Sequence, residues 1–196
     1  MITNGAFMED KQKIARMEKI LRELLDEIGI DKKSEAYENT PRRMAGMYIE
    51  VFSGMYNSDD ISHITLFDNP GYSDILCLKK IPFYSMCLHH FLPMFGHVSV
   101  AYIPSDKIVG LSKIPRIVKH FASRPQVQEE LTKDLADYFN DKLRANGVLV
   151  MVNARHLCME MRGVKSHGVE TISSAIRGSF KTNPTTKDEA LKLIMG

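Results

Sequence analysis

The stretch "SMCLHHFLP", residues 85–93, places one cysteine and two histidines close together. Cys87 and His90 stand in C-x-x-H spacing, and His89 directly precedes His90. Thiolate sulfur and imidazole nitrogen are preferred zinc ligands, and a cysteine beside a histidine can also form a nucleophile–base pair. The residue types therefore indicate a metal site, an activated nucleophile or a buried patch of soft side chains.

A third sulfur or nitrogen ligand would favour the metal site. Cys158, in "ARHLCMEMRG", lies at the end of a predicted strand and is the best candidate. Two cysteines and one histidine would leave the fourth tetrahedral position open, as in catalytic zinc sites, where the metal lowers the pKa of bound water to about 7. His156 could instead supply a fourth ligand to a closed structural site. Cys77 lies on an alternating apolar segment and is expected to be a core residue.

Basic residues gather at the start of a predicted helix. "GLSKIPRIV" places Ser112, Lys113 and Arg116 there. A helix N-terminus with added cations favours phosphate binding, because its free N–H groups and dipole attract anions. An ordinary helix start with solvated charges is the alternative.

Two further polar clusters bear on the ligand. Gln128 and Glu129 lie in "RPQVQEELT" at the start of the next predicted helix, and Arg162 follows soon after Cys158. A metal, several cations and a carboxylate together indicate a phosphorylated, nitrogen-rich small molecule as ligand.

The composition is that of an ordinary globular protein. The chain has 196 residues, 44% hydrophobic and 26% charged, and its net charge of +2 is too small to argue for nucleic acid or a membrane. No apolar run is long enough for a transmembrane helix. The N-terminus has no apolar core of a signal peptide and the cysteine count of 3 is odd, so reduced thiols and a cytoplasmic location are expected.

The hydrophobic pattern predicts an α+β fold. Apolar residues at spacings of three and four predict a helix over 10–29, and Thr40 with Pro41 predicts the start of a second. Two more helical segments meet near Arg124 and Pro125, and a short helix is expected over 187–194. Period-two alternation predicts strands over 74–83 and 97–104. Turn signals and an apolar run predict further strands over 107–112, 148–156 and 169–180. Because these strands are joined as hairpins, an antiparallel sheet with helices on one side is expected.

Four stretches together resemble the GTP cyclohydrolase I family. They are "SMCLHHFLP", "VAYIPSDKIVGLSKIPRIVKHFASRPQVQEELT", "HLCMEMRGV" and "TISSAIRG", and the similarity runs from Thr40 to about Phe180. The resemblance implies a tunnelling fold (T-fold), an antiparallel sheet with two helices on one face, over 58–196. An N-terminal helical region, a helical pair, would occupy 1–57. It also implies a homodecamer with active sites at subunit interfaces.

The resemblance further implies a reaction and a set of roles. The reaction is the zinc-dependent hydrolytic opening of the GTP purine ring, which releases formate and forms 7,8-dihydroneopterin triphosphate, the first step of pterin or folate biosynthesis. The implied zinc ligands are Cys87, His90 and Cys158; the implied acid–base residues are His89 and His156; the implied substrate contacts are Glu129, Gln128, Ser112, Lys113, Arg116, Arg162 and Arg43.

Two positions depart from the family pattern, and other functions stay open. Leu88 stands where the family usually has glutamate, and Gly46 where bacterial members often have a basic residue. One alternative is a T-fold enzyme that acts on another pterin or a deazapurine. The other is a non-catalytic oligomer with structural zinc. Metal content and formate release from GTP would separate these alternatives.

Overall fold

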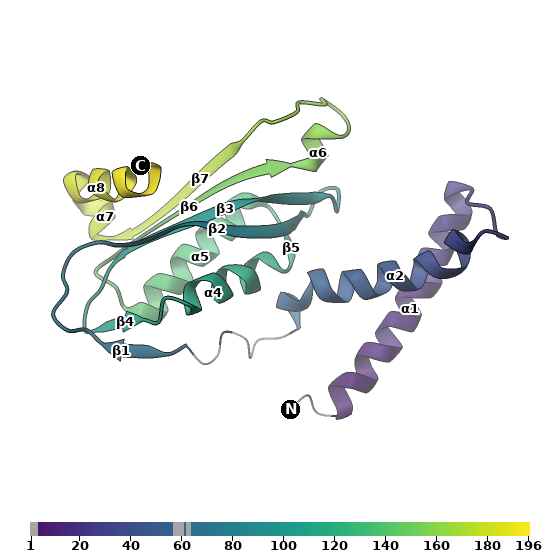
Figure 1. Cartoon of the computed structure of the whole chain (residues 1–196), viewed down its shortest axis with the longest axis horizontal. Helices are drawn as coiled ribbons and strands as arrows, with labels where there is room; N and C mark the ends of the chain where they lie inside the picture. The colour runs from purple at the N-terminus through teal and green to yellow at the C-terminus, as the bar shows by residue number, and fades with distance from the viewer. Residues whose placement is uncertain (1–3, 57–60, 62–63) are drawn as a thin grey trace. The chain divides into compact units, whose positions relative to one another are not determined.

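The computed structural model describes residues 4–56, 61 and 64–196 (Figure 1). The chain divides into two compact units, one ending at Ser53 and the other formed by Gly54–Gly196. The boundary expected between residues 57 and 58 lies outside the described residues. None of the described helices combines the length and apolarity that a bilayer crossing demands.

The N-terminal unit is a pair of packed helices, α1 (Asn4–Ile28) and α2 (Glu35–Val51), followed by the short 3₁₀ helix η1 (Ser53–Met55). The predicted start of α2 at Thr40 is wrong. Ser34 caps the helix instead, because its hydroxyl accepts the N–H of Tyr37 at 3.1 Å.

Pro41 consequently lies inside α2, where a proline removes a backbone hydrogen bond. The carbonyl four residues earlier, that of Tyr37, is the one left without its helical donor. Arg22 of α1 donates to this oxygen from Nη1 at 3.1 Å and to the carbonyl of Glu38 from Nη2 at 3.2 Å. A side chain from the neighbouring helix thus replaces the donor that proline lacks.

The apolar stripe of α1 is wider than the surface that α2 covers. Leu21 and Leu25 are buried, whereas Ile20, Leu24 and Ile28 are exposed. The helix was predicted from all of these positions, so part of the stripe remains at the surface of this chain.

The second unit is built on a five-stranded sheet in the order β5-β2-β3-β6-β7. Its strands are β2 (Leu76–Cys87), β3 (Pro93–Ile103), β5 (Pro125–Gln126), β6 (Gly147–His156) and β7 (Thr171–Gly178). All neighbours pair antiparallel except β5, which runs parallel to β2. A separate antiparallel pair is formed by β1 (Leu66–Asp68) and β4 (Lys107–Val109).

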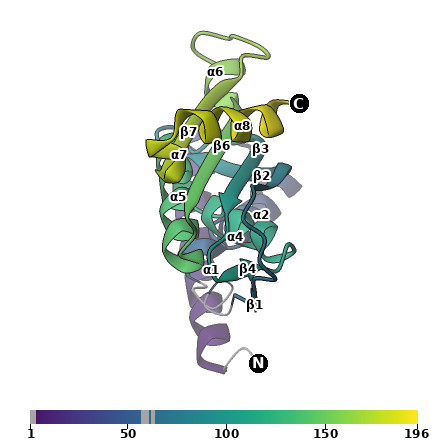
Figure 2. The same ribbon diagram turned by 90° about the vertical axis from the view of Figure 1, so that its left-hand side faces the viewer.

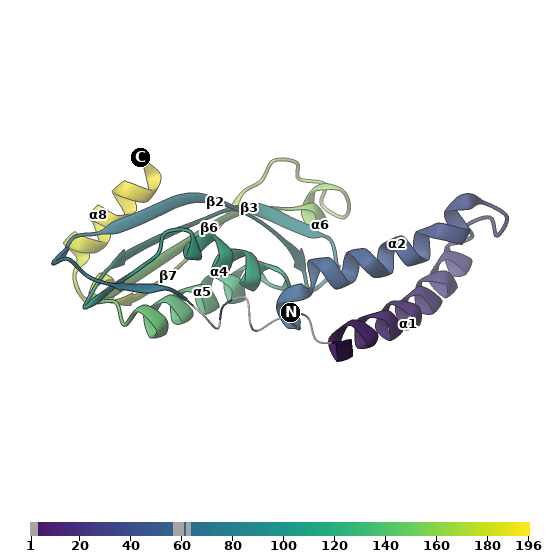
Figure 3. The ribbon, with the colours of Figure 1, turned by 60° about the horizontal axis from the view of Figure 1, so that its bottom comes forward.

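Helices α4 (Lys113–Ala122) and α5 (Gln128–Leu143) cover one face of the sheet, as Figure 3 shows. Val100 and Tyr102 of β3 point into this main core, with Leu131 and Leu135 of α5. Alternate strand residues, such as Ala101, point to the other face, because side chains alternate across a strand.

Two C-terminal helices cover part of that other face. They are α7 (Ser179–Thr182) and α8 (Pro184–Met195), and α8 lies across the strands in Figure 2. Phe180, Ala190 and Ile194 pack there against Ala101 and Leu149. The expected fold class is confirmed: a tunnelling-fold antiparallel sheet with two helices on one face, preceded in the chain by a helical pair.

Candidate metal centre

Cys87 and His90 belong to the tight turn between β2 and β3. Cys87 is the last residue of β2, and its carbonyl accepts the N–H of Phe91 at 2.9 Å and that of His90 at 3.4 Å. Phe91 has a φ of 52°, a left-handed conformation that turns the chain back into β3. The C-x-x-H spacing therefore corresponds to positions i and i+3 of a turn, which lie close together.

Cys158 reaches the same place through the sheet. It lies on α6 (Leu157–Glu160), a short helix directly after β6, and not on the strand end expected from the sequence. At the start of β3, Met86 of β2 pairs with Pro93 while His156 of β6 pairs with Met94. Since β3 lies between β2 and β6, the ends of those two strands come together.

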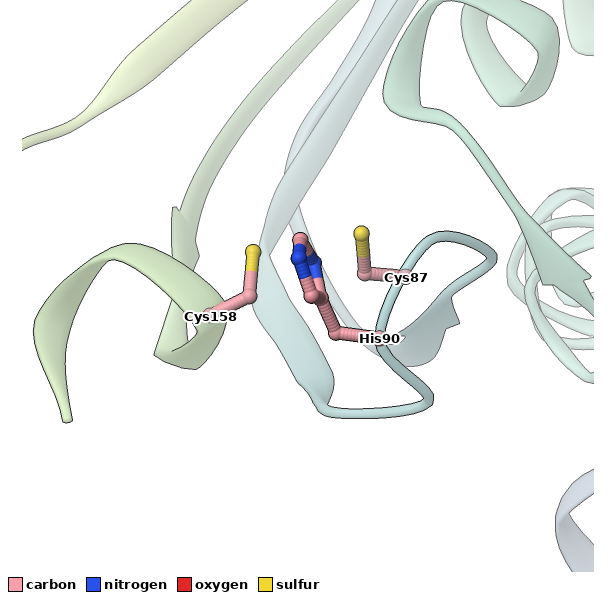
Figure 4. Close-up of side chains that lie close together, drawn as sticks. All are labelled: Cys87, His90 and Cys158. Atoms are coloured by element: carbon pink, nitrogen blue, oxygen red, sulfur yellow. The ribbon is translucent and has the colours of Figure 1, made fainter. Parts of the chain in front are cut away.

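The three residues form what we call the Cys-His-Cys group. The ligand atoms of Cys87, His90 and Cys158 all lie within 4.8 Å of one another, and Figure 4 shows the three side chains converging from the turn and from α6. Cys87 is buried, Cys158 is half-buried and His90 is exposed. The group is thus anchored in the core on one side and open on the other.

The donor chemistry fits zinc. Two sulfurs and one nitrogen at tetrahedral zinc would be about 3.5 Å apart, so small side-chain movements suffice. Burial raises the pKa of the Cys158 thiol, and its hydrogen bond to Cys87 adds to this rise. Metal binding would replace the thiol protons, because the thiolate is the ligand.

Neither of the two other candidate histidines, His89 and His156, belongs to the Cys-His-Cys group. His89 is exposed beside it, with its ring centroid 6.2 Å from that of His90 in an edge-to-face arrangement. His156, considered above as a fourth ligand, has its Nε2 2.8 Å from Oε1 of Gln128. Among the residues that the structure describes, the group has three protein donors, the number typical of a catalytic zinc site.

The side chain of Gln128 points inward and determines the tautomer of His156. It is only 2% exposed, and its Nε2 donates to the carbonyls of Val152 (3.1 Å) and Thr171 (2.9 Å) and to Oγ of Ser173 (2.9 Å). Because these partners accept, the amide nitrogen faces them and the amide oxygen faces the ring. His156 must then carry its proton on Nε2 and present a lone pair on Nδ1.

Burial lowers the pKa of His156, and the negative charge of Glu129 opposes this shift. The Glu129 carboxylate is therefore close enough to His156 for its charge to act on the imidazole. Glu129 is exposed in the first turn of α5, next to the inward-facing Gln128. A free carboxylate, a neutral imidazole and the Cys-His-Cys group therefore border one region of the surface.

The basic residues of α4 lie away from this region within one chain. Ser112 precedes the helix without capping it by a side-chain bond, Lys113 is half-buried and Arg116 is exposed. The C-terminal end of α4 leads into β5, where Pro125 pairs with Met86 beside Cys87. A helix rises about 1.5 Å per residue, so the N-terminal end of this 10-residue helix lies about 15 Å further off.

The two arginines expected to contact the substrate, Arg162 and Arg43, belong to different units of the chain. Arg162 is exposed just after α6, and its charge lowers the pKa of Cys158 against the larger effect of burial, so it lies near the Cys-His-Cys group. Arg43 belongs to the N-terminal unit, where it donates from Nη2 to Oε1 of Glu35 at 2.7 Å.

An interaction that the sequence analysis missed lies beside Cys158. Arg155 and Glu160 form a two-bond ion pair across α6. Opposite charges on either side of Cys158 in "ARHLCMEMRG" were the available signal. This signal is weak because a spacing of five residues matches neither a helix face nor a strand face.

The sheet, its two helices and a three-donor group with an open side define a tunnelling-fold protein with a metal-compatible site. Residues 17–195 match the model of the family "GTP cyclohydrolase I". GTP cyclohydrolase 1 of Carboxydothermus hydrogenoformans is 47% identical over 188 residues, covering 95% of this chain and 96% of that protein. GTP cyclohydrolase 1 of Aquifex aeolicus is also 47% identical over 188 residues, covering 95% and 98%. The chain belongs to the GTP cyclohydrolase I family.

Among solved structures, the archaeosine synthase QueF-Like in the apo form is similar with a TM-score of 0.46 at 24% identity. The match covers 54% of this chain and 95% of that one.

Proposed function

We propose that this protein opens the purine ring of GTP by hydrolysis, releases formate and forms 7,8-dihydroneopterin triphosphate. One zinc ion per chain would be held by Cys87, His90 and Cys158. The observation that carries the proposal is the convergence of these ligand atoms within 4.8 Å, with His90 exposed, in a member of this family. Bound zinc would supply Lewis-acid activation of water at neutral pH.

Two other histidines, His89 and His156, would move protons. His89, which is exposed beside His90, would protonate a purine nitrogen and so make C8 more electrophilic. His156 holds its proton on Nε2 against Gln128, so its Nδ1 is available to accept a proton. Gln128 would contribute to the substrate pocket through this bond.

Glu129 would select guanine. A carboxylate can accept one hydrogen bond from N1–H and another from the 2-amino group of the base. Adenine lacks both donors on that edge, and a site with an unpaired carboxylate rejects such an analogue strongly. The exposed position of Glu129 next to His156 supports this role.

The triphosphate would meet Ser112, Lys113 and Arg116 at the start of α4, together with Arg162 and Arg43. We propose that the start of α4 comes from a second copy, because within one chain α4 directs that end away from the Cys-His-Cys group. A homodecamer with sites between subunits is the proposed assembly. The exposed Ile20 and Ile28 of α1 offer apolar surface for subunit contacts.

The test is product formation by the full-length protein. Zinc-loaded protein is incubated with GTP, formate is quantified, and neopterin fluorescence is read after oxidation. ATP serves as the matched substrate control and should give neither product. Absence of formate from GTP with stoichiometric zinc bound would reject the proposal.

The pathway and the cellular location extend the proposal. The product would enter pterin or folate biosynthesis. The three cysteines are free thiols, which supports a reducing compartment such as the cytoplasm. Fractionation of the native host with an antibody to this chain would test the location.

A further inference from the structure

Arg155 and Glu160 form an ion pair with two parallel hydrogen bonds. Nε of Arg155 donates to Oε1 of Glu160 at 2.8 Å, and Nη2 donates to Oε2 at 2.6 Å. This fork geometry fixes both the distance and the orientation of the two side chains, unlike a contact between single charges. Arg155 is the penultimate residue of β6, and Glu160 is the last residue of α6.

Glu160 is a buried carboxylate with several partners. Its side chain is 6% exposed, whereas that of Arg155 is 43% exposed. The bonds from Arg155 lower the pKa of Glu160, and the backbone N–H of Gly168 contributes to the same shift. Gly168 belongs to the loop that leads to β7, so one carboxylate ties together β6, α6 and that loop.

The other end of the pair is held by the sheet. Phe95 pairs with Arg155 across β3 and β6, and the guanidinium carbon lies 5.5 Å from the centroid of the Phe95 ring. A guanidinium over an aromatic face is attracted by the ring quadrupole. The contact with Phe95 of the sheet therefore helps to orient the Arg155 side chain toward Glu160.

Helix α6 needs such support. It has four residues, and a helix of that length is not stable by itself because nucleation is costly. Its N-cap residue, His156, makes no side-chain capping hydrogen bond. Among its backbone bonds, Met161 N–H donates to Leu157 O at 3.0 Å and Ser166 N–H to Met159 O at 2.9 Å. Cys158 lies within the segment that the Arg155–Glu160 pair spans.

We infer that Arg155 and Glu160 are positioning residues for Cys158: their ion pair fixes α6 against β6 and thereby holds the Cys158 sulfur within reach of Cys87 and His90. The inference rests on the metal part of the proposed function. Residues that orient metal ligands typically change metal affinity by about 10–100-fold when they are replaced.

The experiment measures zinc binding without GTP. Metal-free full-length protein is titrated with Zn²⁺ in competition with a chromophoric chelator, for the wild type, Glu160→Gln and Arg155→Met. Both variants should bind zinc about 10–100-fold more weakly. Cobalt-loaded samples should also show a weakened or shifted thiolate-to-metal absorption band, since the Cys158 sulfur is less well placed.

Asp137→Asn is the matched control. Asp137 accepts a 2.7 Å bond from Nε of Arg177, an ion pair that joins α5 to β7. Asp137→Asn should keep wild-type zinc affinity. Wild-type affinity in either test variant that folds, judged by thermal unfolding of the metal-free protein, overturns the inference. An equal loss in Asp137→Asn also overturns it, since the effect would then be general destabilisation. If the wild-type protein binds zinc but makes no formate from GTP, the proposed function is rejected and the inference about Arg155 and Glu160 still stands.

Discussion

Oε1 of Gln128 lies 2.8 Å from Nε2 of His156, and this contact places the imidazole proton on Nε2. The assignment follows from the three acceptors around the amide nitrogen of Gln128. Gln128, which was expected to contact the substrate, thus bonds His156 from inside the protein and sets its tautomer.

Replacing Gln128 with leucine should reduce GTP turnover strongly while zinc content stays unchanged. The variant leaves the buried carbonyls of Val152 and Thr171 without this donor, and each unsatisfied group costs about 1–3 kcal/mol. The melting temperature should therefore fall by several degrees. Ser173→Ala is the control, because it removes one acceptor of the amide and leaves the bond to His156. Equal turnover in the two variants would refute a role for the Gln128–His156 bond.

Cys158→Ser should lose both zinc and activity, because serine oxygen is a poor replacement for a thiolate ligand. Metal content by elemental analysis and formate release are the measurements. Cys77→Ser is the matched control, since Cys77 is a half-buried thiol of β2 outside the Cys-His-Cys group. A Cys158→Ser protein with one zinc per chain would show that this residue is not a ligand.

His89→Ala should keep zinc and lose activity by about two to four orders of magnitude, the usual range for a positioned acid or base. The side chain is exposed and lies outside the Cys-His-Cys group, so the fold should be unaffected. Single-turnover formate release together with metal analysis checks both halves of the prediction. Loss of metal would instead identify His89 as a ligand.

Glu129→Gln should weaken GTP binding by about 1–3 kcal/mol, because an amide NH₂ group would face the N–H donors of guanine. Zinc content should not change. The neighbouring Glu130→Gln is the control for removing one negative charge from the first turn of α5. Equal Kd values for GTP in wild type and Glu129→Gln would mean that the base is recognised elsewhere.

The Arg177–Asp137 ion pair should contribute to acid sensitivity. The hydrogen bond from Arg177 holds the pKa of Asp137 below its usual value of 3.8. A lowered pKa in the folded state means that the stabilisation is present above the unfolded-state pKa and is lost as the pH falls through the folded-state pKa. In Asp137→Asn, urea unfolding should depend less on pH below about 4 than in the wild type. Parallel pH curves would show that the pair contributes nothing.

The sequence by itself predicted most of the second unit. Period-two alternation marked β2 and β3, an apolar run marked β6, which is buried on both faces at its start, and apolar spacings of three and four marked α4 and α5. The C-x-x-H spacing indicated that Cys87 and His90 lie close, since four residues form one turn. Their role as zinc ligands with Cys158 remains a prediction.

Other features were decided only by tertiary structure. The N-cap of α2 is Ser34 and not Thr40, and the helix continues through Pro41, where Arg22 of another helix bonds the carbonyl that the proline leaves without a donor. Local propensity cannot include a donor from a distant segment.

In the site, too, the sequence predicted some features and the tertiary structure decided others. Cys158 meets Cys87 because β3 pairs with both β2 and β6 in one particular register, and a shift of one residue would turn the strand side chains to the other face. The tautomer of His156 and the pairing of Arg155 with Glu160 likewise depend on which groups the folded chain brings within hydrogen-bond distance. The sequence determined which chemical groups are present, and long-range packing decided how they are oriented.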